Sequence, residues 1–301
     1  MIDILLATYN SKQFLNEQID SIIAQDYTNW RLIVRDAGSS DNTINILQKY
    51  QQKLGTEKFI IINNNKPSSS LENFCELLKY SDSEYIMFCD HDDVWLPNKI
   101  SLSLHHLQKI KNQKQPLIVF SDKKVVDENL NLLNKSFFRY SKLNPYKLGL
   151  NNLITQNVAS GCTMLFNNAL LKIIDIDVMK KCAVMHDHWL MLVAKLFGEI
   201  SYLNQPTILY RQHKKNVLGA PSFMTKLKRY KNFHDRFRES CKQCQGILDN
   251  YGDKIDGKTT IMLKKFTDLP NCNFFRKRYI ILKYRFFKHG LLRNLGVFFL
   301  I

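Results

Sequence analysis

No apolar stretch in this 301-residue chain reaches the roughly 18 residues that a membrane-spanning helix needs. The longest one, near the C-terminus, is interrupted by Lys288, Arg293 and Asn294. The N-terminal residues show neither a basic segment nor an apolar segment ahead of a cleavage site, so we expect no secretion signal. Glycine and proline are scarce, at 11 and 7 residues, which excludes collagen-like and disordered classes.

Cysteines are few as well, and their seven positions do not form a disulfide framework, so we expect a reducing, cytoplasmic location. Cys241 and Cys244 have the spacing of a metal-binding pair, but only His234 and Cys272 lie near them as further ligands. The sequence therefore argues against zinc. With 45% hydrophobic and 23% charged residues, the composition is that of a packed globular protein.

Acidic residues become rare towards the C-terminus. Residues 221–301 hold 18 Lys and Arg against 6 Asp and Glu, a net charge of +12, whereas residues 1–220 hold 25 against 21, a net charge of +4. A boundary is expected at Ala220-Pro221, with basic helices after it. Such a segment suits nucleic acid, an anionic membrane surface or a polyanionic substrate, and charge alone does not choose among them.

The first hundred residues alternate strand and helix signals, which implies βαβ units and a mainly parallel sheet. The first helix is expected to be capped by Asn10-Ser11 and to bury Leu15, Ile19 and Ile22. A later helix begins at His186. Strands are predicted at residues 2–7, 31–34, 59–62, 85–89, 117–121, 162–166 and 207–210.

Three polar clusters follow predicted strands: Thr8-Tyr9-Asn10, Asp36-Ala37-Gly38-Ser39 and Asp90-His91-Asp92-Asp93. Parallel sheets bind ligands at the carboxyl ends of their strands. The shared placement of the clusters indicates a ligand with several polar parts, such as a nucleotide with its sugar and phosphates.

The third cluster packs three carboxylates into four residues, which repel one another unless a cation neutralises them. Mg²⁺ and Mn²⁺ prefer oxygen ligands and take the remaining ones from phosphate and water. The alternative is an acidic loop solvated at a helix start, where Asp complements the helix dipole.

Asp187 lies between two histidines and ahead of Trp189, neighbours that can desolvate a carboxylate and raise its pKa towards that of a general base. The alternative is that Asp187 is only the N-cap of the helix. His213, within the basic segment 211–215, is a candidate metal or phosphate ligand or else a solvated loop histidine.

The last 28 residues interleave aromatic and basic side chains, which is typical of a helix lying in a membrane interface. The alternative is a helix packed on the rest of the chain with a solvated basic face. The apolar side chains expected to face the membrane are Ile280, Leu282, Phe286, Phe287, Leu291, Leu292, Leu295, Phe298 and Phe299.

In their order and spacing, these clusters resemble the family 2 inverting nucleotide-sugar glycosyltransferases with the GT-A fold. The resemblance covers roughly residues 1–219, and the Asp-x-Asp-Asp-x-Trp-Leu-Pro form is most similar to bacterial rhamnosyltransferases that build capsular or cell-wall polysaccharides. It implies a GT-A domain over residues 1–219 and a basic helical region over residues 220–301. The fold of the first domain would be α/β, with a mainly parallel, Rossmann-like sheet flanked by helices. The matching segments are residues 7–10, 35–43, 89–97, 186–189 and 210–213.

The resemblance also implies roles for single residues. Asp187 would be the catalytic base, and a divalent ion, Mg²⁺ or Mn²⁺, would bind Asp90, Asp92 and His213. One position departs from the family. The family usually has the sequence Asp-Asp-Gly-Ser, and in this chain Ala37 replaces the second Asp, which removes a hydrogen-bond acceptor near the nucleotide. The residues implied to contact the nucleotide sugar are Thr8, Tyr9, Asn10, Asp36, Asp90, Arg211 and His213.

The implied reaction is a single displacement that inverts the anomeric carbon and moves a sugar, rhamnose first among the candidates, to a polyisoprenoid-linked glycan. We expect the enzyme to lie on the cytoplasmic face of the cell membrane, against anionic lipid. Two other functional classes fit the sequence less well. A nucleic-acid-binding protein is disfavoured because three clustered aspartates repel phosphate, and a nucleotidyltransferase because residues 8–12 hold no glycine-rich phosphate loop.

Overall fold

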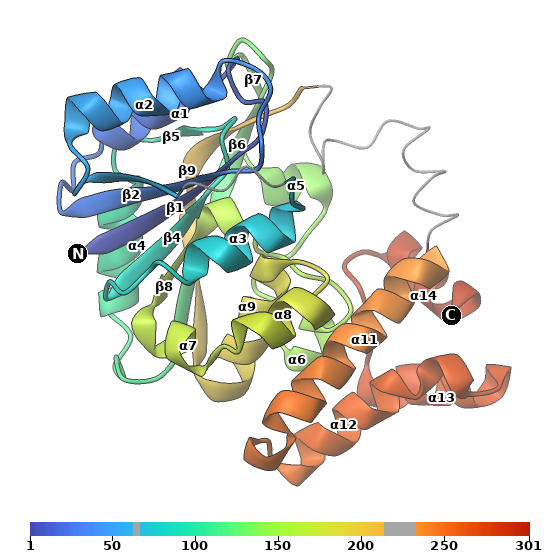
Figure 1. Cartoon of the computed structure of the whole chain (residues 1–301). Helices are drawn as coiled ribbons and strands as arrows, with labels where there is room; N and C mark the ends of the chain where they lie inside the picture. Colours follow the sequence, from blue (N-terminus) through green and yellow to red (C-terminus); the bar gives the residue numbers. More distant parts are fainter. Residues whose placement is uncertain (63–66, 214–232) are drawn as a thin grey trace.

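The computed structural model describes residues 1–62, 67–213 and 233–301, and over these residues nine strands form one sheet. Its order is β3-β2-β1-β4-β8-β6-β9-β5, with β7 paired to β6 (Figure 1). The strands are β1 (Ile2–Thr8), β2 (Trp30–Asp36), β3 (Phe59–Ile62), β4 (Tyr85–Cys89), β5 (Val94–Trp95), β6 (Leu117–Val126), β7 (Leu132–Asn134), β8 (Met164–Asn167) and β9 (Glu199–Arg211).

Strands β1 to β4 pair in parallel, as do β6 and β9, which confirms the predicted α/β class. The other half of the sheet is mixed, because β8 enters antiparallel between β4 and β6. β5 and β7 also pair antiparallel with their neighbours. The parallel half places the ends of β1, β2 and β4, with their polar clusters, at one edge of the sheet.

Helices cover both faces of the sheet (Figure 1). The α-helices are α1 (Leu15–Ile23), α2 (Thr43–Leu54), α3 (Ser70–Leu78), α4 (Lys99–Gln108), α5 (Phe137–Ser141), α6 (Leu150–Leu153), α7 (Asn168–Ile173), α8 (Ile176–Cys182), α9 (His186–Phe197), α11 (Phe233–Tyr251), α12 (Gly257–Thr267), α13 (Phe274–Tyr284) and α14 (Leu291–Leu300). Short 3₁₀ turns lie at Gly161–Thr163, Gly252–Lys254 and Leu269–Asn271.

Strand β1 shows how the sequence builds two cores. Successive side chains of a strand point to opposite faces. Ile4 and Leu6 pack with α1, α2 and α4, whereas Leu5 and Ala7 pack with α3 and α9. All of β1 is buried, which explains why residues 2–7 read as a continuous apolar run.

Several boundaries differ from those predicted. The Asn10-Ser11 cap is wrong, because α1 begins at Leu15 and its N-cap is Phe14. Instead, the Ser11 hydroxyl accepts a hydrogen bond from Tyr9 N at 3.0 Å and its carbonyl accepts from Leu15 N at 3.1 Å, which forms the turn before the helix. Strands β6 and β9 are far longer than predicted. The added part of β6 contains the buried polar residues Asp122 and Lys123, whereas the added part of β9, residues 199–206, is rich in polar residues and mostly exposed or half-buried, so neither continues the apolar pattern.

Helix α11 packs against α8 and α9, α12 packs on α11, and α13 packs on α12, so the C-terminal helices do not stand apart (Figure 1). Their buried residues Cys244, Leu263 and Phe286 belong to the same hydrophobic cluster as Leu5 and Trp189. The expected boundary at Ala220-Pro221 lies outside the described residues, so the division into two domains stays a prediction.

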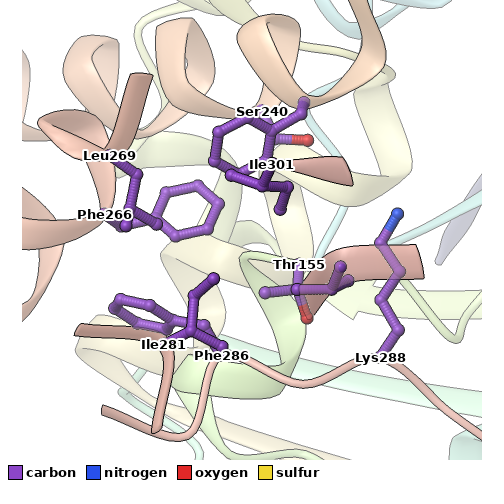
Figure 2. Close-up of a pocket in the computed structure, with 10 residues that line it drawn as sticks. Thr155, Ser240, Phe266, Leu269, Ile281, Phe286, Lys288 and Ile301 are labelled. Carbon is purple, nitrogen blue, oxygen red and sulfur yellow. The ribbon is translucent and has the colours of Figure 1, made fainter. Parts of the chain in front are cut away.

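Part of the expected membrane face is wrong. Ile280 and Phe286 are buried, because they fill the space between α12 and α13 together with Phe266. A cavity of about 10 Å³ lies there, with Lys288 at its side (Figure 2). That volume is about one water. No helix in the part of the chain that the structure describes is long and apolar enough to span a membrane.

The seven cysteines are all free thiols. Cys241 and Cys244 lie within the buried face of α11, where burial raises the pKa of the Cys241 thiol to about 12. A neutral, buried thiol is a poor metal ligand. These two cysteines are therefore part of the hydrophobic core, in agreement with the sequence argument against zinc.

Candidate active site

The ends of β1 and β2 are joined by hydrogen bonds through Asp36. The Thr8 hydroxyl donates to Asp36 Oδ2 at 2.8 Å, and the Ser39 hydroxyl donates to the same oxygen at 2.6 Å. The backbone N–H groups of Gly38 and Ser39 donate to Oδ1 at 3.0 and 2.6 Å. The turn requires glycine, since Gly38 has a φ of 83°. The structure thus uses the Asp36 carboxylate to shape this loop.

The loop after β1 frames a cavity of about 400 Å³. Tyr9 is exposed at its side, and Ala37, at the position where the family usually has Asp, contributes only a methyl group to its wall. Asn10 fixes the loop by accepting a hydrogen bond from Ser40 N at 2.9 Å. Cavities of this size suit a small-molecule ligand. The lining residues are Tyr9, Ala37, Pro67, Ser68, Ser69 and Glu72.

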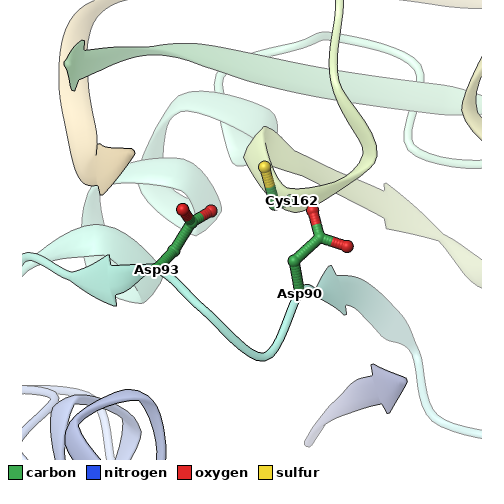
Figure 3. A group of neighbouring side chains, drawn as sticks. All are labelled: Asp90, Asp93 and Cys162. Atoms are coloured by element: carbon green, nitrogen blue, oxygen red, sulfur yellow. The ribbon is translucent and has the colours of Figure 1, made fainter. Parts of the chain in front are cut away.

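After β4 the chain brings Asp90 and Asp93 together with Cys162, whose ligand atoms all lie within 4.8 Å of one another (Figure 3). Asp93 is fully buried, and its Oδ1 accepts a hydrogen bond from Arg211 N at 3.2 Å. Its Oδ2 has no hydrogen-bond partner within the described residues. Burial and then the charges of Asp92 and Asp90 raise the pKa of Asp93.

This arrangement fits a hard divalent cation. A buried carboxylate oxygen without a donor is costly, and the side chains of Asp93 and Asp90 both extend from the loop towards Cys162 (Figure 3). Oxygen donors of this kind are those that Mg²⁺ and Mn²⁺ select. The sequence predicted Asp90 as a metal ligand, whereas Asp93 becomes a candidate ligand only in the structure.

Asp92 and His213, the other two predicted metal ligands, bond to each other. His213 Nε2 lies 2.8 Å from Asp92 Oδ2. Burial alone would raise the pKa of Asp92, but the hydrogen bond with His213 and the charges of His91 and His213 hold that pKa below its usual value. Asp92 lies between Asp90 and Asp93 in the same loop, and the metal-binding role of the pair stays a prediction.

Arg211 lies behind the acidic loop and is 1% exposed. Its Nε donates to the Asp92 carbonyl at 3.0 Å, and its guanidinium also bonds Glu17 and the Glu128 carbonyl. The same group stacks on the Phe14 ring at 4.4 Å. These contacts hold the loop in shape, and contact of Arg211 with the nucleotide sugar stays a prediction.

Asp187 is in the first turn of α9, partly buried, and its Oδ2 accepts a hydrogen bond from Gly161 N at 3.0 Å. The N-cap of α9 is Met185, so the alternative that Asp187 is merely the cap is wrong. Burial raises the pKa of Asp187 to about 6, and the charge of Asp90 adds to the rise. A carboxylate with that pKa is ionised at neutral pH and basic enough to take a proton.

The residues on either side of Asp187 are buried and anchor α9. His188 Nε2 contacts the Leu153 carbonyl at 2.6 Å, and its Nδ1 contacts Gln243 Nε2 of α11 at 3.1 Å. Gln243 Oε1 accepts from Val184 N at 2.8 Å. His186 packs between the rings of Phe74 and Phe88. The helix that presents Asp187 is thus fixed on both sides.

Sequence reasoning missed Asp93 as a separate ligand candidate, and it missed Cys162 and Lys123 entirely. The carboxylate density of residues 90–93 contained a signal for Asp93. Cys162 lies in the 3₁₀ turn before β8, and Lys123 lies on β6, where its Nζ donates to Ser160 Oγ at 3.0 Å. The proximity of these segments to β4 depends on the order of the strands in the sheet, which nothing in a single sequence reports.

Comparison with known proteins gives relatives of one kind. The model of glycosyl transferase family 2 matches residues 3–173. The chain is 29% identical to the dTDP-rhamnosyl transferase RfbG of Shigella flexneri over 246 residues, 74% of this chain and 77% of that protein. It is 27% identical over 206 residues to the UDP-Glc:alpha-D-GlcNAc-diphosphoundecaprenol beta-1,3-glucosyltransferase WfgD of Escherichia coli, 68% of this chain and 73% of WfgD.

Two solved structures share the fold. S. aureus TarS 1-349 in complex with UDP-GlcNAc matches with a TM-score of 0.61 at 16% identity, covering 94% of this chain and 80% of that one. The mannosyltransferase PcManGT from Pyrobaculum calidifontis, in complex with GDP-Man and Mn²⁺, matches with a TM-score of 0.58 at 13% identity, covering 93% and 73%. The chain therefore belongs to glycosyl transferase family 2, with a GT-A fold, and is a glycosyltransferase that uses a nucleotide-sugar donor.

Proposed function

We propose that this enzyme transfers rhamnose, with inversion, from a dTDP-linked donor to a lipid-linked glycan during the synthesis of a bacterial surface polysaccharide. The observation that carries the reaction class is Asp187, a partly buried carboxylate with a pKa of about 6 held beside the acidic group at the end of β4. The donor follows from the name of RfbG and the acceptor from that of WfgD.

In the proposed reaction, Asp187 accepts the proton of an acceptor hydroxyl while that oxygen attacks the anomeric carbon. The bond from the anomeric carbon to the diphosphate breaks in the same step, and the nucleoside diphosphate leaves on the opposite side. One displacement inverts the anomeric centre and needs no covalent enzyme intermediate. Gly161 N holds the Asp187 carboxylate in place for this transfer.

The leaving diphosphate gains negative charge, which the site must stabilise. We propose that a divalent ion held by Asp90, with Asp93 or the pair Asp92 and His213, supplies a Lewis acid there when bound. His213 lies two residues after the end of β9 and contacts Asp92 in the acidic loop. In this assignment Thr8, Tyr9, Asn10 and Asp36 form the nucleotide side of the site.

The donor assignment predicts which nucleotide sugar stabilises the protein. In the presence of Mn²⁺, we expect dTDP-rhamnose to raise Tm, since a ligand that binds only the folded state stabilises it by mass action. UDP-GlcNAc, UDP-Glc and GDP-Man at equal concentration serve as comparisons, and slow hydrolysis of the sugar is the second measurement. A Tm rise with UDP-Glc and none with dTDP-rhamnose would contradict the proposed donor but leave the reaction class intact.

The acceptor assignment places the enzyme at a membrane, and the C-terminal helices support this. On α13 and α14 many large apolar side chains are exposed, beside the exposed basic residues Arg276, Lys283 and Arg285. Arg278 of α13 joins the two helices, because its guanidinium lies 5.7 Å from the centroid of the Phe298 ring on α14 and donates to the Ile301 carbonyl at 3.2 Å. The exposed apolar side chains are Phe274, Phe275, Tyr279, Leu282, Leu291, Leu292, Leu295 and Phe299.

We propose that this surface, α13 and α14 together, binds the cytoplasmic face of the membrane. Exposed apolar side chains of this size are unusual in a monomeric soluble protein, and the basic residues beside them complement anionic headgroups, each contributing on the order of 1 kcal/mol. Burial of the apolar side chains in the headgroup region adds to this attraction without any span.

The membrane proposal predicts that the protein sediments with vesicles containing anionic lipid and that salt weakens the binding. The double variant Phe275→Ser, Leu292→Ser should lower the partition coefficient by at least about tenfold, because two exposed side chains of 82% and 83% accessibility are removed. Deleting residues 274–301 is unsuitable, because Ile280, Phe286 and Val297 belong to the core.

The matched control is Leu133→Ser on β7, which removes a side chain that is 54% exposed elsewhere on the molecule. It should leave vesicle binding unchanged. If the intact protein ignored anionic vesicles at low salt, the surface of α13 and α14 would be reassigned to a protein partner.

A further inference from the structure

Lys123 is a buried cation beside the acidic group. It lies on β6, is 3% exposed, and its Nζ donates to Ser160 Oγ at 3.0 Å. The ammonium also lies over two aromatic rings, 3.6 Å from the centroid of Tyr210 and 4.3 Å from that of Phe137. No carboxylate oxygen lies within 4.0 Å of Nζ anywhere in the described residues, so Lys123 is held without a direct ion pair.

A buried ammonium without a salt bridge is costly unless other charges compensate it. The compensation comes from the acidic residues around it. Burial alone would lower the pKa of Lys123, yet the acidic groups around it, Cys162 and Tyr210 first and then Asp93 and Asp90, hold that pKa above its usual value, so the amine stays charged. In return, its charge limits the rise that burial causes in the pKa values of Asp90, Asp93 and Asp187.

We propose that Lys123 is the built-in counter-cation of the Asp90 and Asp93 group, which keeps the empty site from binding a divalent ion tightly. A fixed positive charge near the carboxylates neutralises part of their charge and repels a second cation. The donor's diphosphate adds negative charge, so the ion then enters together with the nucleotide. This inference rests on the proposed metal site.

The segment that holds the Lys123 ammonium also holds Asp187. Ser160 and Gly161 form one short segment, in which Ser160 accepts from Lys123 and Gly161 N donates to Asp187. Lys99, the other buried lysine nearby, donates to the Cys162 carbonyl at 3.0 Å, and its ammonium lies 4.6 Å from the centroid of the Trp95 ring. Burial lowers the pKa of Lys99 to about 8, whereas that of Lys123 is held above its usual value.

The test is a titration of the whole protein with Mn²⁺ alone, without nucleotide, read from the electron paramagnetic resonance signal of free Mn²⁺. We expect Lys123→Met to bind Mn²⁺ about 10- to 100-fold more tightly than the wild type, since a unit charge close to a divalent ion in a partly buried site has an effect of that order. Adding a nucleoside diphosphate should then strengthen Mn²⁺ binding less in the variant than in the wild type.

Two controls separate this effect from net charge and packing. Lys124→Met removes the same charge from the other face of β6 and should leave Mn²⁺ affinity near that of the wild type. Lys123→Arg keeps the charge and should also stay near the wild type. If Lys123→Met folds only in the presence of Mn²⁺, that result supports the inference, because the ion replaces the missing charge.

Three outcomes would count against it. Equal or weaker Mn²⁺ binding by Lys123→Met would overturn the inference while leaving the metal site in place. Absence of Mn²⁺ binding by the wild type and every variant would overturn the metal site as well. Failure of both Lys123→Met and Lys123→Gln to fold even with Mn²⁺ would show that Lys123 acts through packing, which also overturns it.

Discussion

Asp187→Asn lowers the turnover of sugar transfer by about 10²- to 10⁴-fold, the usual cost of deleting a general base. The amide keeps the volume of the side chain and can still accept the hydrogen bond from Gly161 N, so the fold and donor affinity should persist. The measurements are kcat and KM in a transfer assay, together with Tm. A loss confined to kcat is the signature of a base that acts in the chemical step.

The pH profile gives a second readout of the same residue. The pKa of Asp187 is raised to about 6, and the base must be ionised, so the wild-type rate should fall as the pH drops below about 6. Asp187→Asn should lack that acid limb. Asp253→Asn, at an exposed position far along the chain, is the matched control and should change neither rate nor profile. An unchanged rate with a lowered Tm would assign Asp187 to structure.

Asp90→Asn should lower transfer by about 10²- to 10⁴-fold and abolish its stimulation by Mn²⁺ or Mg²⁺, because a lost metal ligand removes several kcal/mol of stabilisation from the leaving diphosphate. The protein should remain folded, since removing one of three adjacent carboxylates relieves repulsion. The measurements are the transfer rate against metal concentration and the affinity for Mn²⁺ alone.

Asp92→Ala tests the neighbouring carboxylate, which the family resemblance makes a metal ligand and which the structure pairs with His213. We expect it to abolish transfer without unfolding the protein. The metal assignment would be wrong if both variants kept near-normal activity in buffer treated with a chelator. A loss in Asp90→Asn alone would favour Asp93 as the second ligand.

The part of the fold in which strands β1 to β4 alternate with helices could be predicted, because local sequence patterns determine it. Strands β1 to β4 are buried apolar runs separated by amphipathic helices, and each ends in polar residues that the parallel arrangement brings to one edge. The antiparallel insertion of β8 between β4 and β6 could not be predicted, because strand order depends on packing between distant segments. The lengths of β6 and β9 were missed because the added residues, 122–126 and 199–206, contain polar side chains that break the apolar pattern.

The site divides in the same way. Asp187 and the acidic loop could be found from local residue types and from the family resemblance. The roles of Asp36 and Arg211 in shaping loops were hidden, since their partners Thr8 and Glu17 lie 28 and 194 residues away. The sequence allowed the C-terminal helices either to pack on the rest of the chain or to lie in a membrane interface, and the burial of Ile280 and Phe286 shows that part of this segment packs into the core.

Gly246 on α11 explains why the C-terminal helices cannot be exchanged as a module. A Cβ atom at this position would lie 2.6 Å from Cys182 Cβ at the end of α8 and 3.3 Å from the Trp189 ring of α9, so α11 approaches both helices too closely for a side chain here. Gln243, one turn earlier, bonds His188 next to Asp187. A chimera that takes these helices from another glycosyltransferase would also take that protein's spacing between α11 and α9. Because α9 carries Asp187, such an exchange would alter the position of the proposed base as well as the packing of the C-terminal helices.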